Sequence, residues 1–168
     1  MGWANCGEDS RGRPIGYAHP ARCDEQGCEE KIDRGLAHAC GGMHGTEDRK
    51  GDSCCEGYFC DKHLIAFALF GIFLCRRCAR ERCETLVEEA TYFLSLGEKT
   101  NAFQFQELLG FGMRTLDLTA EDVAEDVETT RSTVEQWSKG AASPPGMKSF
   151  VATKLRARAK ERLRAFTS

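Results

Sequence analysis

Closely spaced cysteine and histidine residues are the part of this sequence most suited to chemistry. The pairs Cys60–His63 and Cys75–Cys78 each have two residues between their members, and the looser pair Cys23–Cys28 has four. Thiolate and imidazole groups at such spacing supply ligands in pairs to one tetrahedral Zn²⁺ ion. The types and spacing of these residues therefore predict a zinc-binding region between residues 23 and 78.

The residues of this region that could ligate Zn²⁺ are Cys23, Cys28, Cys40, His44, Cys54, Cys55, Cys60, His63, Cys75 and Cys78. No signal peptide is visible at the start of the chain, so we expect a reducing, cytoplasmic location, in which ten cysteines favour metal ligation over disulfides. Buried, reduced cysteines without a metal are the alternative, but they would not need paired spacing.

The segments that must position these ligands are poor in core-forming residues. Residues 23–63 are rich in glycine with little apolar content, so we expect their folding to be coupled to metal binding. Residues 64–74 form an apolar run that is too short to span a membrane. Gly71 can turn this run into a hairpin, which would be either the small core of the zinc module or an exposed face for a partner protein. Residues 1–22 show little pattern beyond a strand beginning near Ile15.

The segment from Cys55 to His63 has the order cysteine, four residues, cysteine, two residues, histidine, with Phe59 before the second cysteine. This order resembles the centre of AN-type stress-associated zinc fingers. The resemblance implies a treble-clef or cross-brace-like module with interleaved ligands. The resemblance further implies two structural Zn²⁺ ions, one held by Cys23, Cys28, Cys60 and His63, and the other by Cys40, Cys55, Cys75 and Cys78. His44 or Cys54 could replace Cys40 or Cys55. The chain departs from that family in its four-residue first gap, its Gly-rich insert after Cys40 and its final Cys-x-x-Cys.

A second motif spans residues 118–140 and predicts two short helices joined by a tight turn. Thr119 can cap the first helix, with Asp122 in a capping-box position, and Thr129 or Thr130 can cap the second. The residues that fall on the inner faces at helical spacing are Ala120, Val123, Ala124, Val127, Val134 and Trp137. This pattern is typical of a helix-turn-helix.

The motif resembles the Cro and phage-repressor-like (XRE-type) DNA-binding family at Thr130–Val134, Trp137, Lys139–Gly140 and Pro144–Pro145. The resemblance implies a five-helix repressor-like domain whose second motif helix enters the major groove of duplex DNA. The residues expected to contact DNA are Thr130, Arg131, Ser132, Thr133, Gln136, Lys139 and Ser143. Two departures are Glu128, where the family usually has glycine, and Ala120, where it usually has a polar residue.

Arg131, Ser132 and Gln136 are the side chains expected at base edges, since arginine suits guanine and glutamine suits adenine. Thr130, Lys139 and Ser143 would contact phosphates. Charge is segregated along this half of the chain. Residues 117–128 carry six acidic residues and no basic one, whereas residues 148–164 carry seven basic residues and one acidic residue. The acidic segment opposes binding to phosphate, and the basic segment is either a solvated helix face or a phosphate-contacting one.

We therefore expect an α protein with a small zinc-stabilised α+β module. The expected parts are a zinc domain at 1–78, a linking helix at 79–97 and a helix-turn-helix domain at 98–168 with a basic final helix at 147–166. The linking helix is expected to stop at Gly97, and Cys83 is expected to pack on its inner face. Within the last domain, residues 103–114 are expected to form a helix weakened by Gly110 and Gly112.

The function expected from these features is that of a sequence-specific transcriptional regulator, a repressor that acts as a homodimer on palindromic duplex DNA. The organisation resembles zinc-finger and helix-turn-helix antitoxins, and regulators of this type are often bacterial or phage-encoded. The alternative is a protein–protein adaptor whose zinc domain holds a partner protein. No arrangement of acids, bases and nucleophiles in the sequence favours an enzyme, and we expect no membrane association.

Overall fold

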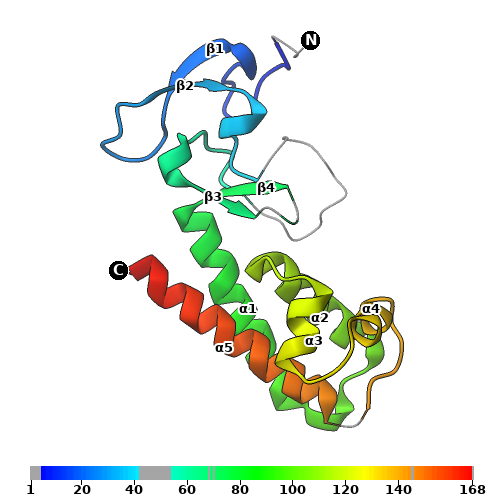
Figure 1. The fold of residues 1–168 in the computed structure, drawn as a ribbon. Helices are drawn as coiled ribbons and strands as arrows, with labels where there is room; N and C mark the ends of the chain where they lie inside the picture. The colour runs from blue at the N-terminus through cyan, green and yellow to red at the C-terminus, as the bar shows by residue number, and fades with distance from the viewer. Residues whose placement is uncertain (1–4, 42–53, 68, 70, 145, 168) are drawn as a thin grey trace. The chain divides into compact units, whose positions relative to one another are not determined.

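The structure, a computed structural model, describes residues 5–41, 54–67, 69, 71–144 and 146–167 (Figure 1). The chain divides into two compact units, Met1–Ala79 and Arg80–Ser168. The first contains two small sheets and the second is helical. Among the described residues, no helix is long and apolar enough to cross a membrane.

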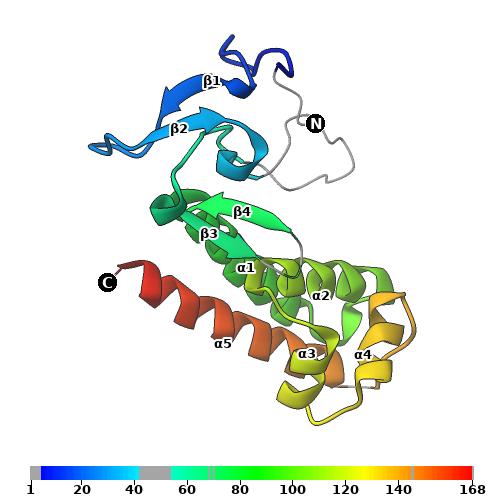
Figure 2. The ribbon, with the colours of Figure 1, turned by 45° about the horizontal axis from the view of Figure 1, so that its top comes forward.

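Two antiparallel pairs of strands make up the first unit (Figure 2). Strand β1 (Gly16–Arg22) pairs with β2 (Lys31–Arg34), and β3 (Leu64–Phe67) pairs with β4 (Ile72–Cys75). One-turn 3₁₀ helices span Leu36–His38 and Asp61–His63. Gly71 lies between β3 and β4 with φ of +60°, a conformation that favours glycine, so the hairpin predicted there is confirmed.

The apolar run of residues 64–74 is divided between the interior and the surface. Phe67, Ile72 and Leu74 are buried, whereas Leu69 and Phe73 are 52% and 41% exposed. Strand alternation explains this division, because successive side chains of β4 point to opposite faces. Part of the run therefore belongs to the core of the zinc module, as one interpretation predicted, and part is exposed, while binding of a partner protein stays a prediction. Residues 68 and 70 lie outside the described residues.

Among its described residues, the second unit contains most of a first helix, four further helices and a 3₁₀ turn at Gly97–Lys99. The helices are α1 (Arg76–Leu96), α2 (Ala102–Leu116), α3 (Ala120–Asp126), α4 (Arg131–Ser138) and α5 (Met147–Thr167). Helix α1 begins three residues before the expected Ala79. Its residues Leu86, Ala90 and Phe93 belong to one buried cluster with residues of the other four helices, so the segment expected to be a link forms part of this unit's core.

Helix α2 is longer than the glycines within it suggested. It starts in a capping box in which Asn101 Oδ1 accepts a hydrogen bond from the Gln104 N–H at 2.8 Å, and it continues through Gly110 and Gly112 to Leu116. A Cβ atom at residue 112 would lie 2.7 Å from a methyl carbon of Leu155 in α5. Glycine at this position therefore permits the close packing of α2 against α5.

The two short helices α3 and α4 form the predicted motif and lie next to each other (Figure 1). Thr119 Oγ1 accepts a hydrogen bond from the Asp122 N–H at 3.1 Å, and Asp122 Oδ2 accepts one from the Thr119 N–H at 2.6 Å, so the predicted capping box is confirmed. Thr130, rather than Thr129, caps α4. Glu128 in the turn has φ of +53°, so it adopts the left-handed conformation for which glycine is the usual residue.

The inner face of this motif is buried as expected. Val134 and Trp137 are 0% and 2% exposed. The Trp137 ring meets the Phe105 ring of α2 edge-on at 5.9 Å between centroids, and the Gln106 amide donates to the Ser138 carbonyl at 2.9 Å. These contacts fix α4 against α2 and leave its opposite face at the surface.

Candidate metal centres and nucleic-acid interface

The first unit brings all eight predicted metal ligands into two groups of four. One group is Cys23, Cys28, Cys60 and His63, and the other is Cys40, Cys55, Cys75 and Cys78. Within each group, the ligand atoms all lie within 4.8 Å of one another. This is the division that the resemblance to cross-brace fingers implied. His44 lies outside the described residues, and Cys54 belongs to neither group.

In the first group, the Nδ1 atom of His63 lies 3.2 Å from the Cys60 sulfur and 3.5 Å from the Cys23 sulfur. A tetrahedral zinc ion separates a sulfur ligand from a nitrogen ligand by about 3.5 Å, given Zn–S and Zn–N bonds of about 2.3 and 2.0 Å. The Cys60 N–H donates to the Cys23 sulfur at 3.3 Å, which stabilises a thiolate. The first group therefore has the donor set and spacing that one zinc-like ion requires.

In the second group, the sulfurs of Cys55 and Cys75 are 3.7 Å apart. This is far too long for a disulfide, but it matches the separation of about 3.8 Å between two sulfurs on one tetrahedral zinc. Backbone N–H groups donate to the Cys40 sulfur at 3.2 Å and to the Cys75 sulfur at 3.5 Å. Cys75 ends β4 and Cys78 lies in the first turn of α1, so the junction of strand and helix supplies two ligands.

The thiols of the second group alter one another's ionisation. Hydrogen bonding with Cys40 is the largest cause that lowers the pKa of the Cys55 thiol, and it also lowers the pKa of Cys75 to about 7. The hydrogen bond to Cys55 correspondingly raises the pKa of Cys40, which keeps the shared proton. A divalent cation would replace such shared protons, because metal ligation requires thiolates.

Residues 55–60 form a short segment that supplies a ligand to each group, Cys55 to the second and Cys60 to the first. Its backbone bonds to segments that carry the remaining ligands. The Gly57 carbonyl accepts from the Cys40 N–H at 2.9 Å, and the Tyr58 carbonyl accepts from the Asp24 N–H at 2.8 Å. The two groups therefore share a common backbone element.

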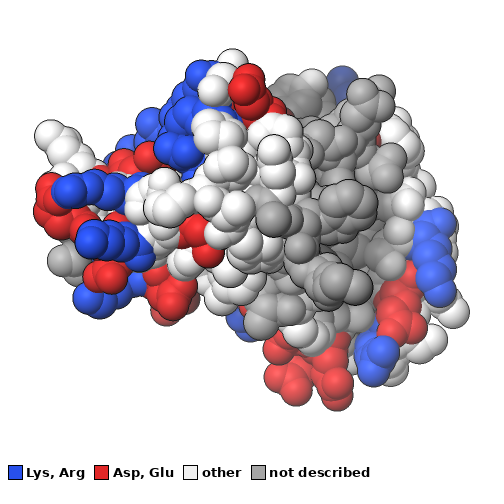
Figure 3. All heavy atoms as spheres, turned by 90° about the horizontal axis from the view of Figure 1, so that it is seen from above, with Lys and Arg blue, Asp and Glu red and all other residues white. Residues whose placement is uncertain are grey.

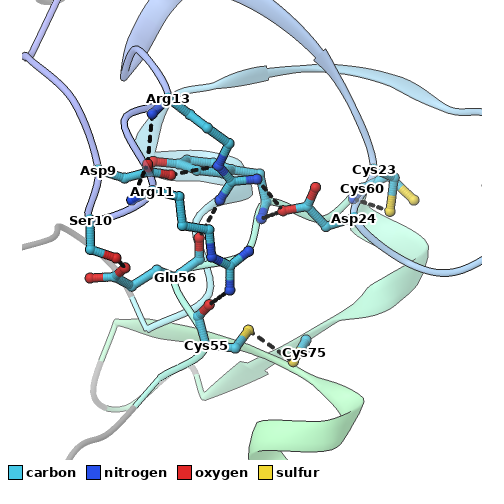
Figure 4. Close-up of polar contacts among 11 residues, drawn as sticks. Asp9, Ser10, Arg11, Arg13, Cys23, Asp24, Cys55, Glu56, Cys60 and Cys75 are labelled. Atoms are coloured by element: carbon cyan, nitrogen blue, oxygen red, sulfur yellow. Dashed lines mark hydrogen bonds and ion pairs between the residues drawn. The ribbon is translucent and has the colours of Figure 1, made fainter.

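A cluster of charged residues beside this segment was not predicted from the sequence. Arg13 pairs with Asp9 and Asp24, and Arg11 donates to the Cys55 carbonyl at 2.8 Å (Figure 4). Burial alone would raise the pKa of Asp9, but hydrogen bonds from Arg13 and Arg11 outweigh it and lower that pKa. The only signal in the sequence is the presence of opposite charges near the N-terminus, which does not specify contacts.

A shallow cleft of about 630 Å³ opens at the first metal group. Two ligands, Cys28 and His63, line it together with Glu29, Glu30 and Lys62. The first group is therefore reached by solvent on one side. In the second group, Cys40, Cys75 and Cys78 are at most 4% exposed.

The residues predicted to contact DNA lie on and after α4. Arg131, Ser132, Gln136 and Lys139 are exposed, and Thr133 is half-buried. Arg131 donates from Nε to Glu135 Oε1 at 2.7 Å, so its guanidinium is already paired one turn along the helix. The hydroxyl oxygen of Ser143 is buried and has no hydrogen-bond partner among the described residues.

Several of the acidic residues before α4 have structural partners. Asp122 caps α3, and Asp126 pairs with Arg158 of α5 at 2.6 Å. Two other basic residues of α5 are also engaged, since Lys148 donates to the Thr100 carbonyl at 3.0 Å and Arg162 to the Thr115 carbonyl at 3.4 Å. Part of the basic face of α5 therefore holds that helix in place rather than facing outward.

Comparison of the chain with protein-family models, with curated proteins and with solved structures gave no match in any of the three searches.

Proposed function

We propose that this protein is a sequence-specific, duplex-DNA-binding transcriptional regulator whose first unit is held together by two structural zinc ions. The observation that carries the proposal is the arrangement of α4, which buries Val134 and Trp137 and exposes Arg131, Ser132 and Gln136. A helix that is fixed on one side and polar on the other can enter a major groove without rearranging the core. The motif resembles that of Cro and phage repressors.

In this proposal, α4 enters the major groove with its N-terminal end first. Arg131 would pair with guanine N7 and O6, and Gln136 with adenine N6 and N7. Lys139 at the end of α4 would contact a phosphate and position the helix without reading sequence. Binding must first exchange the Arg131–Glu135 ion pair for a base contact, which costs little because both side chains are largely exposed.

The donor sets support zinc as the metal. Seven cysteines and one histidine in two groups of four suit zinc rather than Mg²⁺ or Ca²⁺, which take oxygen ligands. The role is structural, because each group already supplies four protein ligands and leaves no position for a substrate. The first unit has few large buried apolar residues, so metal binding would contribute much of its folding energy.

The distribution of charge favours contacts between the second unit and DNA. On the face drawn in Figure 3, which is seen from the side of β1 and β2, basic and acidic side chains are interspersed. A surface of mixed sign attracts phosphate less than a field of one sign does. In the second unit, the pairing of Asp126 with Arg158 reduces the repulsion between α3 and DNA.

The test is selection of random duplex DNA by the zinc-loaded, full-length protein, followed by a salt series on the selected sequences. We expect a palindromic motif, because a homodimer presents two copies of α4, and a steep fall of affinity with salt, because phosphate contacts release counterions. Zinc content is measured on the same sample. No enriched motif from a metal-loaded, folded protein would overturn the proposal.

A second candidate function is a protein–protein adaptor. Three exposed carboxylates, Glu121, Glu125 and Glu128, lie on α3 and in the turn before α4, and the exposed Leu69 and Phe73 lie on the first unit. Carboxylates disfavour phosphate, and exposed apolar side chains favour a protein partner. A DNA association with a flat salt dependence and no sequence preference would favour the adaptor.

A further inference from the structure

The side chain of Arg13 joins segments that are distant in the sequence. Its Nε donates to Asp9 Oδ2 at 2.7 Å, its Nη1 to Asp24 Oδ2 at 2.9 Å, and its Nη2 to the Glu56 carbonyl at 2.7 Å. Figure 4 shows the guanidinium group between these three partners. Because the guanidinium is planar and carries five N–H donors, one arginine can hold all three partners at once.

Two of these partners directly follow a metal ligand. Asp24 follows Cys23 of the first group, and Glu56 follows Cys55 of the second. Asp24 Oδ2 also accepts from the Tyr58 N–H at 2.9 Å. Arg13 therefore holds the ligand-bearing segment of each metal group, from a position outside both.

Arg13 is itself held in place. The Asp9 side chain is fully buried, and its Oδ1 accepts from the backbone N–H groups of Arg11 at 3.0 Å and Arg13 at 2.8 Å. The Arg13 guanidinium carbon lies 5.2 Å from the centroid of the Tyr58 ring, and only 21% of the Arg13 side chain is exposed. Because Arg13 is fixed by these contacts, ordering of the Asp24 segment can be transmitted through it to the Glu56 segment.

We propose that Arg13 is a positioning residue that couples the two metal sites, so that the first ion bound raises the affinity for the second. Metal binding at Cys23 orders the Asp24 segment, and Arg13 then holds the Glu56 segment, with Cys55, in its metal-binding conformation. The reverse holds equally, because such coupling is reciprocal. The inference rests on the two zinc sites of the proposed function and is independent of DNA binding.

The test is a zinc titration of full-length, metal-free protein under reducing conditions, with native mass spectrometry counting molecules that hold no, one or two ions. Coupling energies in proteins correspond to about 5- to 150-fold in affinity. We expect about tenfold here, so at one equivalent of zinc the one-zinc form of the wild type should be about a quarter of the molecules, against about half for two equal sites without coupling. In Arg13→Lys, which keeps the charge but cannot hold Asp24 and Glu56 together, the one-zinc form should accumulate.

Arg156→Lys is the matched control, because Arg156 lies in α5 of the second unit, outside the unit that holds both metal groups. It should load zinc as the wild type does. Cadmium NMR, in which sites with four sulfurs and with three sulfurs and a nitrogen give separate signals, identifies the site that fills first. If Arg13→Lys fails to fold, Asp24→Asn serves instead, since it weakens one of the hydrogen bonds by which Arg13 joins the two segments.

Equal populations of the one-zinc form in wild type and Arg13→Lys would overturn the inference, as would independent loading of the two sites in the wild type. Neither result would argue against zinc binding at the two sites. A wild-type protein that binds no zinc would overturn both this inference and the metal part of the proposed function. DNA binding does not enter these measurements, so failure of the regulator proposal is seen separately in the DNA selection.

Discussion

Arg131 is the exposed side chain on which base recognition by α4 would depend most. Its ion pair with Glu135 extends it along the helix surface, and both groups remain open to solvent. Lys139 is also exposed but lies at the end of α4, where a phosphate contact is expected. The proposed function therefore gives the two residues separable roles, Arg131 in sequence specificity and Lys139 in general affinity for DNA.

Replacing Arg131 by alanine should reduce discrimination at one base pair by roughly 10- to 100-fold, because a bidentate contact to guanine is lost. Lys139→Ala should weaken binding to all sequences alike and reduce the slope of affinity against salt by about one. Competition binding of each variant to the selected site, to single-base variants and to random duplex measures both effects. Equal losses on selected and random DNA for Arg131→Ala would contradict its assigned role.

Glu128 has a backbone conformation that glycine adopts without strain, with φ of +53° in the turn between α3 and α4. Replacing it by glycine should stabilise the protein by about 1 kcal/mol, since the left-handed conformation costs other residues about 1–2 kcal/mol and glycine loses part of this gain as chain entropy. Denaturant unfolding of the zinc-loaded protein measures the change. The same substitution at Glu125, within α3, should destabilise by about 1 kcal/mol, and a loss at both positions would argue against strain in the turn.

Among the helices, the contact between α2 and α5 depends on the absence of a side chain at residue 112. Leu155 is 2% exposed and fills the space beside Gly112. Gly110, two residues earlier on the same helix, has only the end of the Arg114 side chain near it, at 3.4 Å from a Cβ atom. The two glycines of α2 therefore differ in their structural role, and only Gly112 is needed for the packing of α2 against α5.

This difference predicts opposite effects of one substitution. Gly112→Ala should destabilise the second unit by about 1–3 kcal/mol, because the added methyl group overlaps Leu155. Gly110→Ala should stabilise it by up to about 1 kcal/mol, since alanine favours helix and meets no obstacle. Thermal unfolding followed by helical circular dichroism compares the two variants. A stabilising Gly112→Ala would mean that α5 is not packed against α2 at this point.

In the whole molecule, the two units are stabilised by different interactions. The second unit has a continuous apolar core drawn from all five helices, among them Leu109, Val134 and Leu155. The described core of the first unit is smaller and includes cysteines of both metal groups, with Tyr58 and Phe67 as its largest fully buried side chains. Apolar burial can therefore account for the second unit, whereas we expect the first to require metal ligation in addition.

Removing zinc should therefore unfold the first unit and leave the second folded. In amide hydrogen exchange, Tyr58 and Phe59 should lose protection after treatment with a strong chelator, while Leu109 and Val134 keep theirs. Adding back zinc under reducing conditions should restore the protection. Retained protection throughout the first unit of a metal-free protein would show that the cysteine groups are not needed for its folding.

Local patterns in the sequence were enough to predict the elements that are stabilised by interactions between nearby residues. The Thr119–Asp122 capping box and the Gly71 hairpin follow from interactions within a few residues, and both are present in the structure. The eight cysteine and histidine residues were identifiable because their paired spacing is itself a property of the chain. Their division into two groups was suggested only by resemblance, and the structure places them together in that way.

Other features depend on contacts between distant residues, which no local pattern contains. The role of Gly112 depends on Leu155 from another helix, and helix α1 joins the second unit's core through contacts such as that of Phe93 with the Phe105 ring of α2. The ion pair between Asp126 and Arg158 likewise reduces the number of charges in the acidic and basic segments that are available for a contact with DNA. Arg13 contacts Asp24 and Glu56 across 11 and 43 residues.

Residue types and spacing thus specified which groups could bind metal and which helices could form, because ligand chemistry, capping and helical periodicity act over short distances along the chain. The tertiary structure decided which ligands share a site, which charges are neutralised and which side chain links the two metal groups. These outcomes depend on how segments pack, and packing brings together residues whose separation in the sequence carries no signal.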